Sequence, residues 1–194
     1  MTSEDLANSH FNHIFHLPSS LITPALHVSK YAGHFVAEEQ NSISWTDFLN
    51  NIRHVPGINL GMLGFHSDAI NQHTTTLKGT IDNIVQLLVP PGQDRGEQLK
   101  AALEVIFTNR NSIQSSGSGW QCQVHFAYVD EGGTEAPKIF HSLVATIKLE
   151  VEGGEEPSWW KPQGEVLRSL SVVIDVVELA VREGFRDPIE VPSQ

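Results

Sequence analysis

Three histidines near the start of the chain have the side-chain type and the spacing that could bind a metal ion. His10, His13 and His16 stand three residues apart in HFNHIFH. On a helix, imidazoles at this spacing would line up on one face and could hold zinc or copper. No carboxylate or cysteine completes the set, and Phe and Ile interrupt it. We therefore favour a histidine-rich leader with no metal site.

A second pair of histidines lies in the two halves of a predicted hairpin. His125 and His141 could approach each other there, and a buried histidine pair would titrate near neutral pH. The alternative, which we favour, is that each is an ordinary hydrogen-bonded residue of a sheet.

Catalytic motifs give no sign of an enzyme. The sequence has no G-x-S-x-G, no phosphate-binding glycine loop, no H-E-x-x-H and no cysteine and histidine arrangement with a known local signature. Ten histidines alone are a weak reason to infer a site. We expect a protein that is not an enzyme and that uses no cofactor.

Size and charge restrict the classes of partner. The chain has 194 residues, 40% of them hydrophobic, which suits one domain with a substantial core. We expect a single domain over 1–194, with a flexible leader at 1–13 and a tail at 182–194. The formal net charge of -11 argues against binding nucleic acid and against electrostatic capture by anionic lipid. A membrane partner would have to be held by apolar contact.

Cysteine usage and the first residues bear on the compartment. Cys122 is the single cysteine, and we expect it to pack as a small apolar group. The start, MTSEDLANSHFNHIF, has acids where a secretory signal has basic residues. No window approaches the length of apolar sequence in a transmembrane helix. These features predict a protein made in the cytoplasm and released without a classical signal peptide.

Helical signals dominate the first half of the chain. Ile14 to Leu17 could be an edge strand at most, because Pro18 follows it. Thr23 and Pro24 predict the start of a helix over 23–36, and a short helix follows in SWTDFLNNIRHV. Apolar residues at a three-four spacing predict a long amphipathic helix over 67–88 capped by Ser67. A last helix, over 95–108, begins at a capping-box-like Asp94 and Glu97.

The second half of the chain has the period of a sheet. Two alternating strands are predicted at Trp120 to Val129 and Ile139 to Val151. The segment from Val166 to Val181 also fits a helix, but its many valines favour a third long strand. The apolar faces of the three strands comprise Trp120, Cys122, Val124, Phe126 and Tyr128; Ile139, Leu143, Ala145, Ile147, Leu149 and Val151; and Val172, Ile174 and Val176.

The length of these strands suggests contact with a membrane. A transmembrane strand needs about 9 to 11 residues, whereas strands of soluble sheets have mostly about five or six. A strand with one apolar and one polar face suits a position between lipid and water. In water the apolar face must be covered, and the amphipathic helices could cover it. The alternative is an α+β domain that never rearranges.

An aromatic pair adds a possible membrane contact. Trp159 and Trp160 stand together in EEPSWWKP, and tryptophan favours the interface between water and lipid. The same pair could instead cap the core of the protein.

Taken in order, several short stretches resemble the Cyt family of cytolytic delta-endotoxins and the related fungal volvatoxin. They are IFHLPSSLITPAL, TIDNIVQLL, QLKAALEVIFTNRNS and QVHFAYVDEGGTEAPKIFHSLVATIKLEVE. The likeness runs in the same order from about residue 14 to residue 181. It implies a single α/β domain in which helical hairpins wrap a central antiparallel sheet.

The resemblance also implies a function. It predicts binding to phospholipid membranes of target cells without a protein receptor, movement of the helices away from the sheet, and homo-oligomeric pores or detergent-like disruption involving the long C-terminal strands. In solution we expect a monomer or dimer. The hypothesis is a pore-forming cytolysin, and the alternative is a lipid- or glycan-binding module of the same fold that does not lyse membranes.

Overall fold

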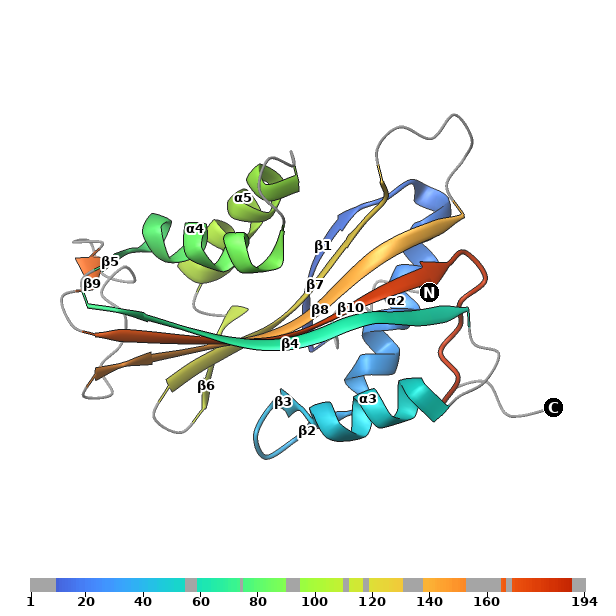
Figure 1. Ribbon diagram of the computed structural model, residues 1–194, viewed down its shortest axis with the longest axis horizontal. Helices are drawn as coiled ribbons and strands as arrows, with labels where there is room; N and C mark the ends of the chain where they lie inside the picture. The colour runs from blue at the N-terminus through green and yellow to red at the C-terminus, as the bar shows by residue number, and fades with distance from the viewer. Residues whose placement is uncertain are drawn as a thin grey trace. The chain divides into compact units, whose positions relative to one another are not determined.

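The computed structural model describes residues 10–54, 59–73, 75–89, 95–109, 112–116, 119–130, 138–152, 165–166 and 169–189. Within them the main sheet has six strands in the order β1-β7-β8-β10-β4, with β6 pairing on β7 (Figure 1). The strands span Phe11–His16 (β1), Leu60–Gln72 (β4), Gln114–Ser116 (β6), Gly119–Tyr128 (β7), Ile139–Val151 (β8) and Leu170–Arg182 (β10).

The long strands confirm most of the predicted sheet. β7 and β8 lie where the alternating pattern placed them, and the strand interpretation of the last segment is confirmed, since β10 is a strand of 13 residues. The sheet is mixed rather than purely antiparallel, because β1 pairs with β7 in parallel while β6 pairs with it antiparallel. Strand direction had no signal in the sequence, since alternation is the same for both.

The described residues gather into two compact units, here called unit 1 and unit 2. Unit 1 comprises Met1–Phe65, Gln123–Ala145 and Val177–Gln194, and unit 2 comprises His66–Cys122 and Thr146–Val176. Strands β4, β7, β8 and β10 contribute residues to both units.

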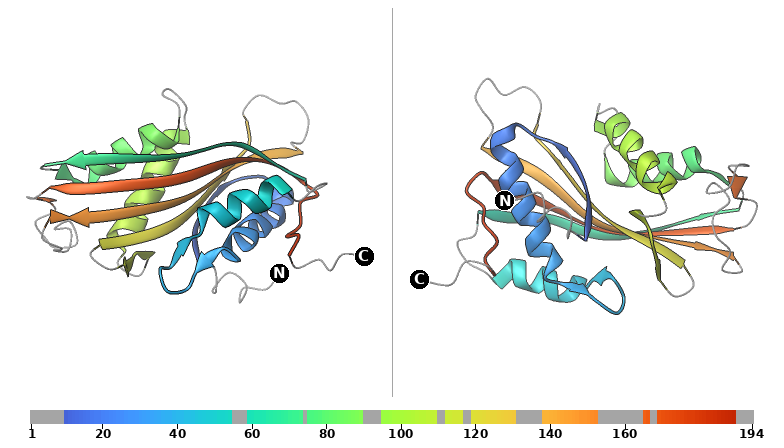
Figure 2. Two further views of the ribbon diagram at one scale, coloured as in Figure 1. Left: turned by 60° about the horizontal axis from the view of Figure 1, so that its bottom comes forward. Right: turned by 180° about the vertical axis from the view of Figure 1, so that it is seen from behind.

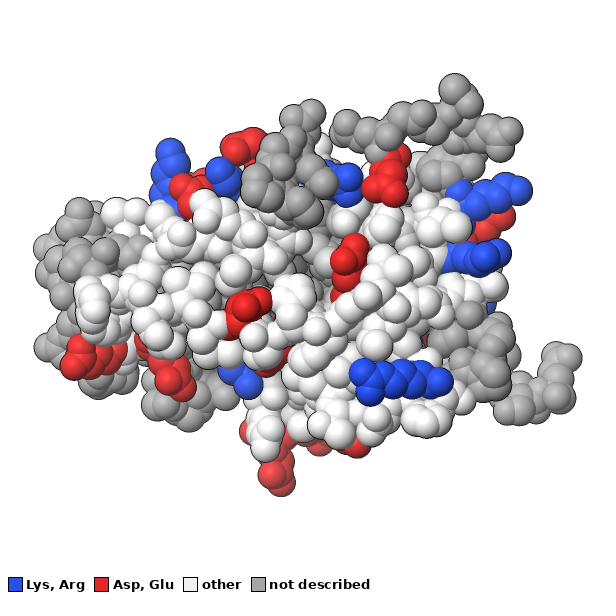
Figure 3. Space-filling model, in the orientation of Figure 1, with Lys and Arg blue, Asp and Glu red and all other residues white. Residues whose placement is uncertain are grey.

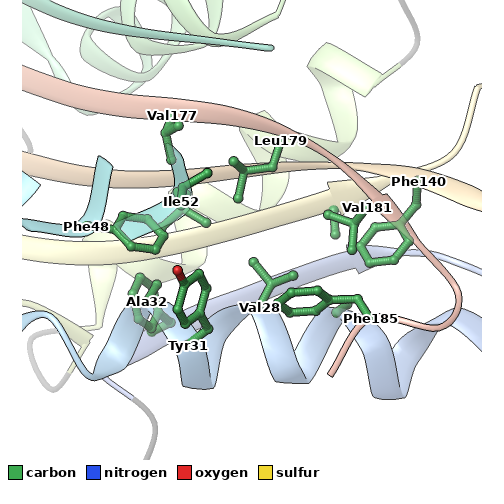
Figure 4. Packing of buried hydrophobic residues seen from close by; sticks show 14 of the residues in the cluster. Val28, Tyr31, Ala32, Phe48, Ile52, Phe140, Val177, Leu179, Val181 and Phe185 are labelled. Atoms are coloured by element: carbon green, nitrogen blue, oxygen red, sulfur yellow. The ribbon is translucent and has the colours of Figure 1, made fainter. Parts of the chain in front are cut away.

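Helices α2 (Ser19–Gly33) and α3 (Trp45–His54) belong to unit 1, and the two-stranded sheet β2 (Val36–Ala37) and β3 (Ser42–Ile43) lies between them in sequence. Both helices pack against strand segments of their unit (Figure 2). Tyr31 of α2 lies between Phe35, Phe48 and Phe185, with ring centroids 5.5 to 6.2 Å away. Figure 4 shows this cluster, in which α2 and α3 meet side chains of β8 and β10: Val28, Ala32, Phe48, Ile52, Phe140, Val177, Leu179 and Val181.

Unit 2 has its own pair of helices, α4 (Leu77–Leu88) and α5 (Arg95–Thr108), which pack against each other. The pair lies along the strand segments of this unit (Figure 1). Lys100 of α5 joins the helices, since its Nζ lies 3.0 Å from Asp82 of α4 and 3.0 Å from Glu97. Strand β5 (Thr75–Thr76), directly before α4, pairs antiparallel with β9 (Glu165–Val166).

The predicted helix over 67–88 is wrong in nearly its first half, residues 67–76. Residues 67–72 belong to strand β4, and helix α4 begins only at Leu77. Its N-cap is Thr76 rather than Ser67, because the Thr76 hydroxyl accepts the amide hydrogen of Gly79 at 3.1 Å. Ser67 instead donates its hydroxyl to Asp175 of β10 at 2.5 Å.

The predicted start of the first helix is also wrong. Helix α2 begins at Ser19, four residues before Thr23, and contains Pro24 in its interior. The extra turn buries Leu21 completely. Burial of a leucine stabilises by about 1.5 to 3 kcal/mol, which offsets the helical hydrogen bond that proline cannot make. The short helix from Trp45, the helix from Arg95 and the edge strand before Pro18 are confirmed.

The expected leader and tail both carry ordered structure. β1 starts at Phe11, within the segment taken as a flexible leader, and Phe11 is buried. Phe185 and Asp187, in the segment taken as a tail, are buried as well. Both segments are short and rich in polar residues, so the sequence pattern did not indicate that these side chains are buried. The capping residue Asp94 lies outside the described residues.

Candidate functional site

The face of β7 that the sequence predicted to contact lipid is covered in this structure. Cys122, Val124, Phe126 and Tyr128 are buried, and Trp120 is half-buried. His16 of β1 lies across Phe126, with the ring centroids 5.9 Å apart. The apolar face of β7 is therefore withheld from water.

The predicted faces of β8 and β10 are covered too. In β8 the buried members are Leu143, Ala145, Ile147, Leu149 and Val151, whereas Ile139 at the strand start is 49% exposed. In β10, Val172, Ile174 and Val176 are buried. Within unit 2 the helices bury a matching apolar set, which comprises Ile81, Ile84, Val85, Leu99, Leu103, Ile106 and Phe107.

Sequence analysis missed a second set of buried strand residues. In unit 1 the buried side chains of β10 are Val177, Leu179 and Val181, which have the opposite parity from Val172, Ile174 and Val176 in unit 2. Phe140 and Val144 of β8 belong with them in the cluster under α2 and α3. The signal in the sequence was the doubled valine, Val176 followed by Val177, which breaks a strict alternation.

The free energy of burying these strand side chains opposes movement of the helices away from them. Each buried valine, leucine or isoleucine contributes about 1.5 to 3 kcal/mol. Exposing Ile147, Leu149, Val151 and the three apolar β10 residues of unit 2 to water would cost roughly 10 kcal/mol or more, which is comparable to the whole stability of a domain. Helix displacement in water is thus unfavourable, and it needs another apolar environment to receive the strands.

A chain of hydrogen-bonded side chains joins α2 to three strands of unit 1. His13 Nε2 of β1 lies 2.9 Å from Ser29 Oγ of α2, and Ser29 Oγ lies 2.6 Å from His125 Nδ1 of β7. His125 Nε2 lies 2.9 Å from Ser142 Oγ of β8. We call these four residues the histidine–serine chain. Ser29, His125 and Ser142 are buried, and His13 is nearly so.

Burial sets the charge of this chain. It lowers the pKa of His13 from 6.5 to about 4. Burial, together with the neighbouring His13, holds the pKa of His125 well below 6.5. Both imidazoles are therefore neutral at pH 7.

The proposed pairing of His125 with His141 does not occur. His141 points to the other face of β8, where Tyr128 stacks on it with ring centroids 5.2 Å apart. Its two nitrogens lie near carboxylates, with Nε2 3.0 Å from Asp130 and Nδ1 3.4 Å from Glu178. Ser142, the next residue of β8, faces His125. Successive residues of a strand point to opposite faces, so His141 points away from His125.

The three early histidines do not form a metal site either. Because they lie at or beside a strand, His13 and His16 point to opposite faces of β1, and the helical alignment that would bring them together does not arise. Among the described residues, no three histidine, cysteine or acidic side chains are placed to share a metal ion.

Comparison with known proteins gives the fold. No family model matches the chain, and no curated protein matches it. Among solved structures, the activated Cyt2Ba monomer of Bacillus thuringiensis subsp. israelensis superposes with a TM-score of 0.66 at 14% identity, over 90% of this chain and 98% of that one. A delta-endotoxin superposes with a TM-score of 0.67 at 13% identity, over 94% of this chain and 84% of that one. The chain has the Cyt-toxin fold.

The Cyt-type fold confirms the resemblance as a statement about structure: a mixed sheet with four described helices. Among the described residues, no helix is long and apolar enough to cross a bilayer. Trp159 and Trp160 lie outside the described residues, so their position at an interface is still a prediction.

The surface charge of this Cyt-type chain agrees with the sequence. On the face in Figure 3 the described basic side chains stand singly or beside acidic ones, and they do not join into a continuous patch. Together with the net charge of -11, this face offers no cationic patch of the kind that anionic lipid attracts.

The single cysteine of the Cyt-type sheet is chemically quiet. Cys122 is 4% exposed, and burial raises the pKa of its thiol to about 12. The thiolate, which is the reactive form, is therefore scarce at neutral pH. The predicted role as a packed apolar group is consistent with this position.

A pocket of about 360 Å³ lies in unit 2, where β4, β8 and β10 end or begin. Four polar side chains, those of Asn71, His73, Glu150 and Ser169, are among its lining. His73 Nδ1 lies 3.1 Å from Ser169 Oγ. Such donors and acceptors suit a hydroxylated ligand.

Proposed function

We propose that the protein is a membrane-active, pore-forming cytolysin. It binds phospholipid bilayers through the apolar faces of β7, β8 and β10, after the helices that cover these faces have moved away. The strands then assemble with those of further copies of the chain. The reaction is physical, so this function requires neither catalysis nor a cofactor.

One observation carries the proposal. Strands of 10, 13 and 13 residues, long enough to cross a bilayer, carry apolar side chains that are buried, on one face of β7 and on a face of β10 that differs between the two units. The Cyt-type fold supports it, because the solved structures it matches are named as an activated Cyt2Ba monomer and a delta-endotoxin. Lipid can receive the strand faces, which removes the cost of exposing them to water.

The test is release of a trapped dye from vesicles of neutral phosphatidylcholine and phosphatidylethanolamine. The protein is added with and without prior protease treatment and across a range of pH. We expect leakage at sub-micromolar protein, together with oligomers that survive SDS after contact with the vesicles. Intact vesicles under every condition would rule out the cytolysin.

The second candidate is a glycan- or lipid-binding module that does not lyse membranes. The polar pocket around Asn71, His73 and Ser169 favours it, since a shallow site with several hydrogen-bonding groups suits a sugar. This candidate predicts binding on glycan or lipid arrays without leakage and without SDS-resistant oligomers. A Ser169→Ala variant would then weaken glycan binding, whereas it leaves leakage by a cytolysin unchanged.

A further inference from the structure

Helix α2 is attached to the strands of unit 1 by one polar connection in the middle of apolar packing. Ser29 is the member that α2 contributes to the histidine–serine chain, and it stands between two imidazoles, at 2.9 Å from His13 and 2.6 Å from His125. Around it, α2 presents Leu21, Ala25, Val28 and Ala32 to the cluster. The chain therefore sets where α2 sits on the strands.

The hydrogen count of the chain fits neutral rings. A neutral imidazole has one N–H and one acceptor nitrogen, and a hydroxyl has one hydrogen. His13 can thus donate to Ser29, Ser29 to His125, and His125 to Ser142, with every contact satisfied; the reverse order works equally well. If both rings are protonated, Ser29 faces two N–H donors and its own hydrogen has no acceptor within the chain. Two positive charges are then buried side by side, with ring centroids 6.2 Å apart.

We propose that the histidine–serine chain is an acid-sensitive attachment of α2, which holds the helix on the strands while its imidazoles are neutral and releases it when they take up protons. None of the four members carries a negative charge to stabilise the protonated state. As a trigger for membrane attack this inference rests on the proposed function, but as a property of the fold it is measurable without any membrane.

The side chains that face His125 in the histidine–serine chain come from three elements. The polar groups that face His125 are His13 from β1, Ser29 from α2 and Ser142 from β8, and among these only His13 has a titratable side chain. From β8, His141 points to the other face, where it meets Asp130 and Glu178.

The other titratable side chains on or next to α2 make contacts of their own. His34, which follows α2, lies 2.7 Å from the buried Asp187, and His27 Nδ1 accepts the amide hydrogen of Asp187 at 3.5 Å. Tyr31 donates its hydroxyl to Asn51. Lys30 lies beside Ser29 in sequence and is half-buried. The contact of His34 with Asp187 is a second polar attachment at the end of α2, separate from the histidine–serine chain.

The pH window follows from the pKa directions. Above about pH 6.5 the rings are neutral whether α2 is attached or released, and attachment is complete. In the released state the rings reach water. As pH falls from 6.5 towards 4, this state therefore binds protons that the attached state does not bind. Each pH unit then raises the ratio of released to attached helix by up to about tenfold per histidine.

The experiment is amide hydrogen exchange of residues 19–33 in the full chain, read by mass spectrometry between pH 7.5 and 4.5 and corrected for the intrinsic pH dependence of exchange. We expect exchange of α2 to rise at least about tenfold between pH 7 and pH 5. The peptide of α5, residues 95–108, serves as an internal reference and should change by less than about threefold. Exchange of α2 that stays flat across this range overturns the inference.

Two sets of variants test the residues. The double variant His13→Gln and His125→Gln replaces the rings by groups that donate and accept without titrating, and it should remove most of the acid response. The matched control His141→Gln removes a histidine on the opposite face and should leave the response unchanged. An equal acid response in the double variant would refute the proposal.

A measurement on the unaltered protein guards against misfolded variants. NMR titration of the imidazoles should show His13 and His125 resisting protonation until α2 opens, with opening and protonation sharing one midpoint; a normal titration of both rings with α2 still attached refutes the inference. Dye release separates the two proposals. Acid opening without leakage at any pH supports the attachment and defeats the cytolysin, whereas leakage without acid opening defeats the attachment alone.

Discussion

Val176 and Val177 are adjacent in β10, and both are fully buried although successive side chains of a strand point to opposite faces. Val176 belongs to unit 2 and Val177 to unit 1. Each unit thus buries a different face of the same strand. The position where the two patterns meet explains why β10 looked partly helical: Leu170, Val173, Val177 and Val181 fall at helical spacing in a strand whose buried parity changes.

Truncation of either valine should destabilise the protein. We expect Val176→Ala and Val177→Ala each to lower the free energy of unfolding by about 2 kcal/mol, because both leave a void in a packed region. The half-buried Val173→Ala should cost less than about 1 kcal/mol. Denaturant unfolding measures all three. If one of the two adjacent valines proved as tolerant as Val173, the change of buried face would be wrong.

Acid should reduce stability through His13. Its pKa of about 4 in the folded chain lies below the unfolded value of 6.5, so the unfolded state binds the extra proton. The contribution is fully present above pH 6.5 and is lost as pH falls to about 4, which amounts to roughly 3 kcal/mol. Unfolding curves at several pH values should show this loss and show it diminished in His13→Gln. A variant with the same pH dependence as the parent would contradict the account.

Cys122 should be protected from thiol reagents. The shift of its pKa to about 12 lowers the thiolate fraction by roughly a thousandfold at neutral pH, and burial blocks access as well. We expect no measurable labelling by a water-soluble disulfide reagent until the protein is unfolded by guanidinium. A cysteine introduced as Val105→Cys, at a side chain that is 66% exposed, should react at the rate of a free thiol. Rapid labelling of native Cys122 would show that β7 is not covered as described.

Ile139 offers a way to test the lipid-facing set without disturbing the core. It is 49% exposed, so Ile139→Lys should fold normally. Loss of its contact with lipid should weaken vesicle binding by about tenfold. Val105→Lys, which makes a comparable apolar-to-lysine change on α5, is the matched control and should bind like the parent. Equal weakening in both variants would point to general charge effects, and no weakening in Ile139→Lys would remove this residue from the membrane surface.

The alternating strands could be predicted because their signal is local. β7 and β8 have an apolar side chain at nearly every second position, and this period fixes both the element and its buried face. β4 could not be predicted, since Ile70 continues in helical phase with Leu77 and Ile81. The contact that identifies Ser67 as part of a strand, its hydrogen bond to Asp175, joins residues 108 positions apart.

The histidine–serine chain was beyond sequence reasoning for the same reason. Its contacts join positions 16, 96 and 17 residues apart, on four different elements. His125 was recognised as a candidate from its type, but its partners depend on how α2 and β1 pack. The approach to His141, which the sequence allowed and which we did not favour, is absent because His141 faces the other side of the hairpin.

A pair of cysteines can fix α2 in place. A Cβ on Gly33, at the end of α2, would lie 3.8 Å from Cδ2 of His10, just before β1. In a Cys122→Ala background, His10→Cys with Gly33→Cys therefore places two thiols between the end of the helix and the start of the edge strand, where oxidation tests for a disulfide. The matched control is Val85→Cys with Gly96→Cys, since a Cβ on Gly96 lies 3.6 Å from Val85. It joins α4 to α5 and leaves the pair able to move together.

Dye release by the protein with α2 locked in this way tests helix displacement most directly. We predict that the oxidised His10→Cys and Gly33→Cys protein binds and lyses vesicles far less than the parent, that reduction of the disulfide restores leakage, and that the α4–α5 control lyses in both states. Leakage equal to that of the parent, with the disulfide shown to be closed by a free-thiol assay, would contradict the account.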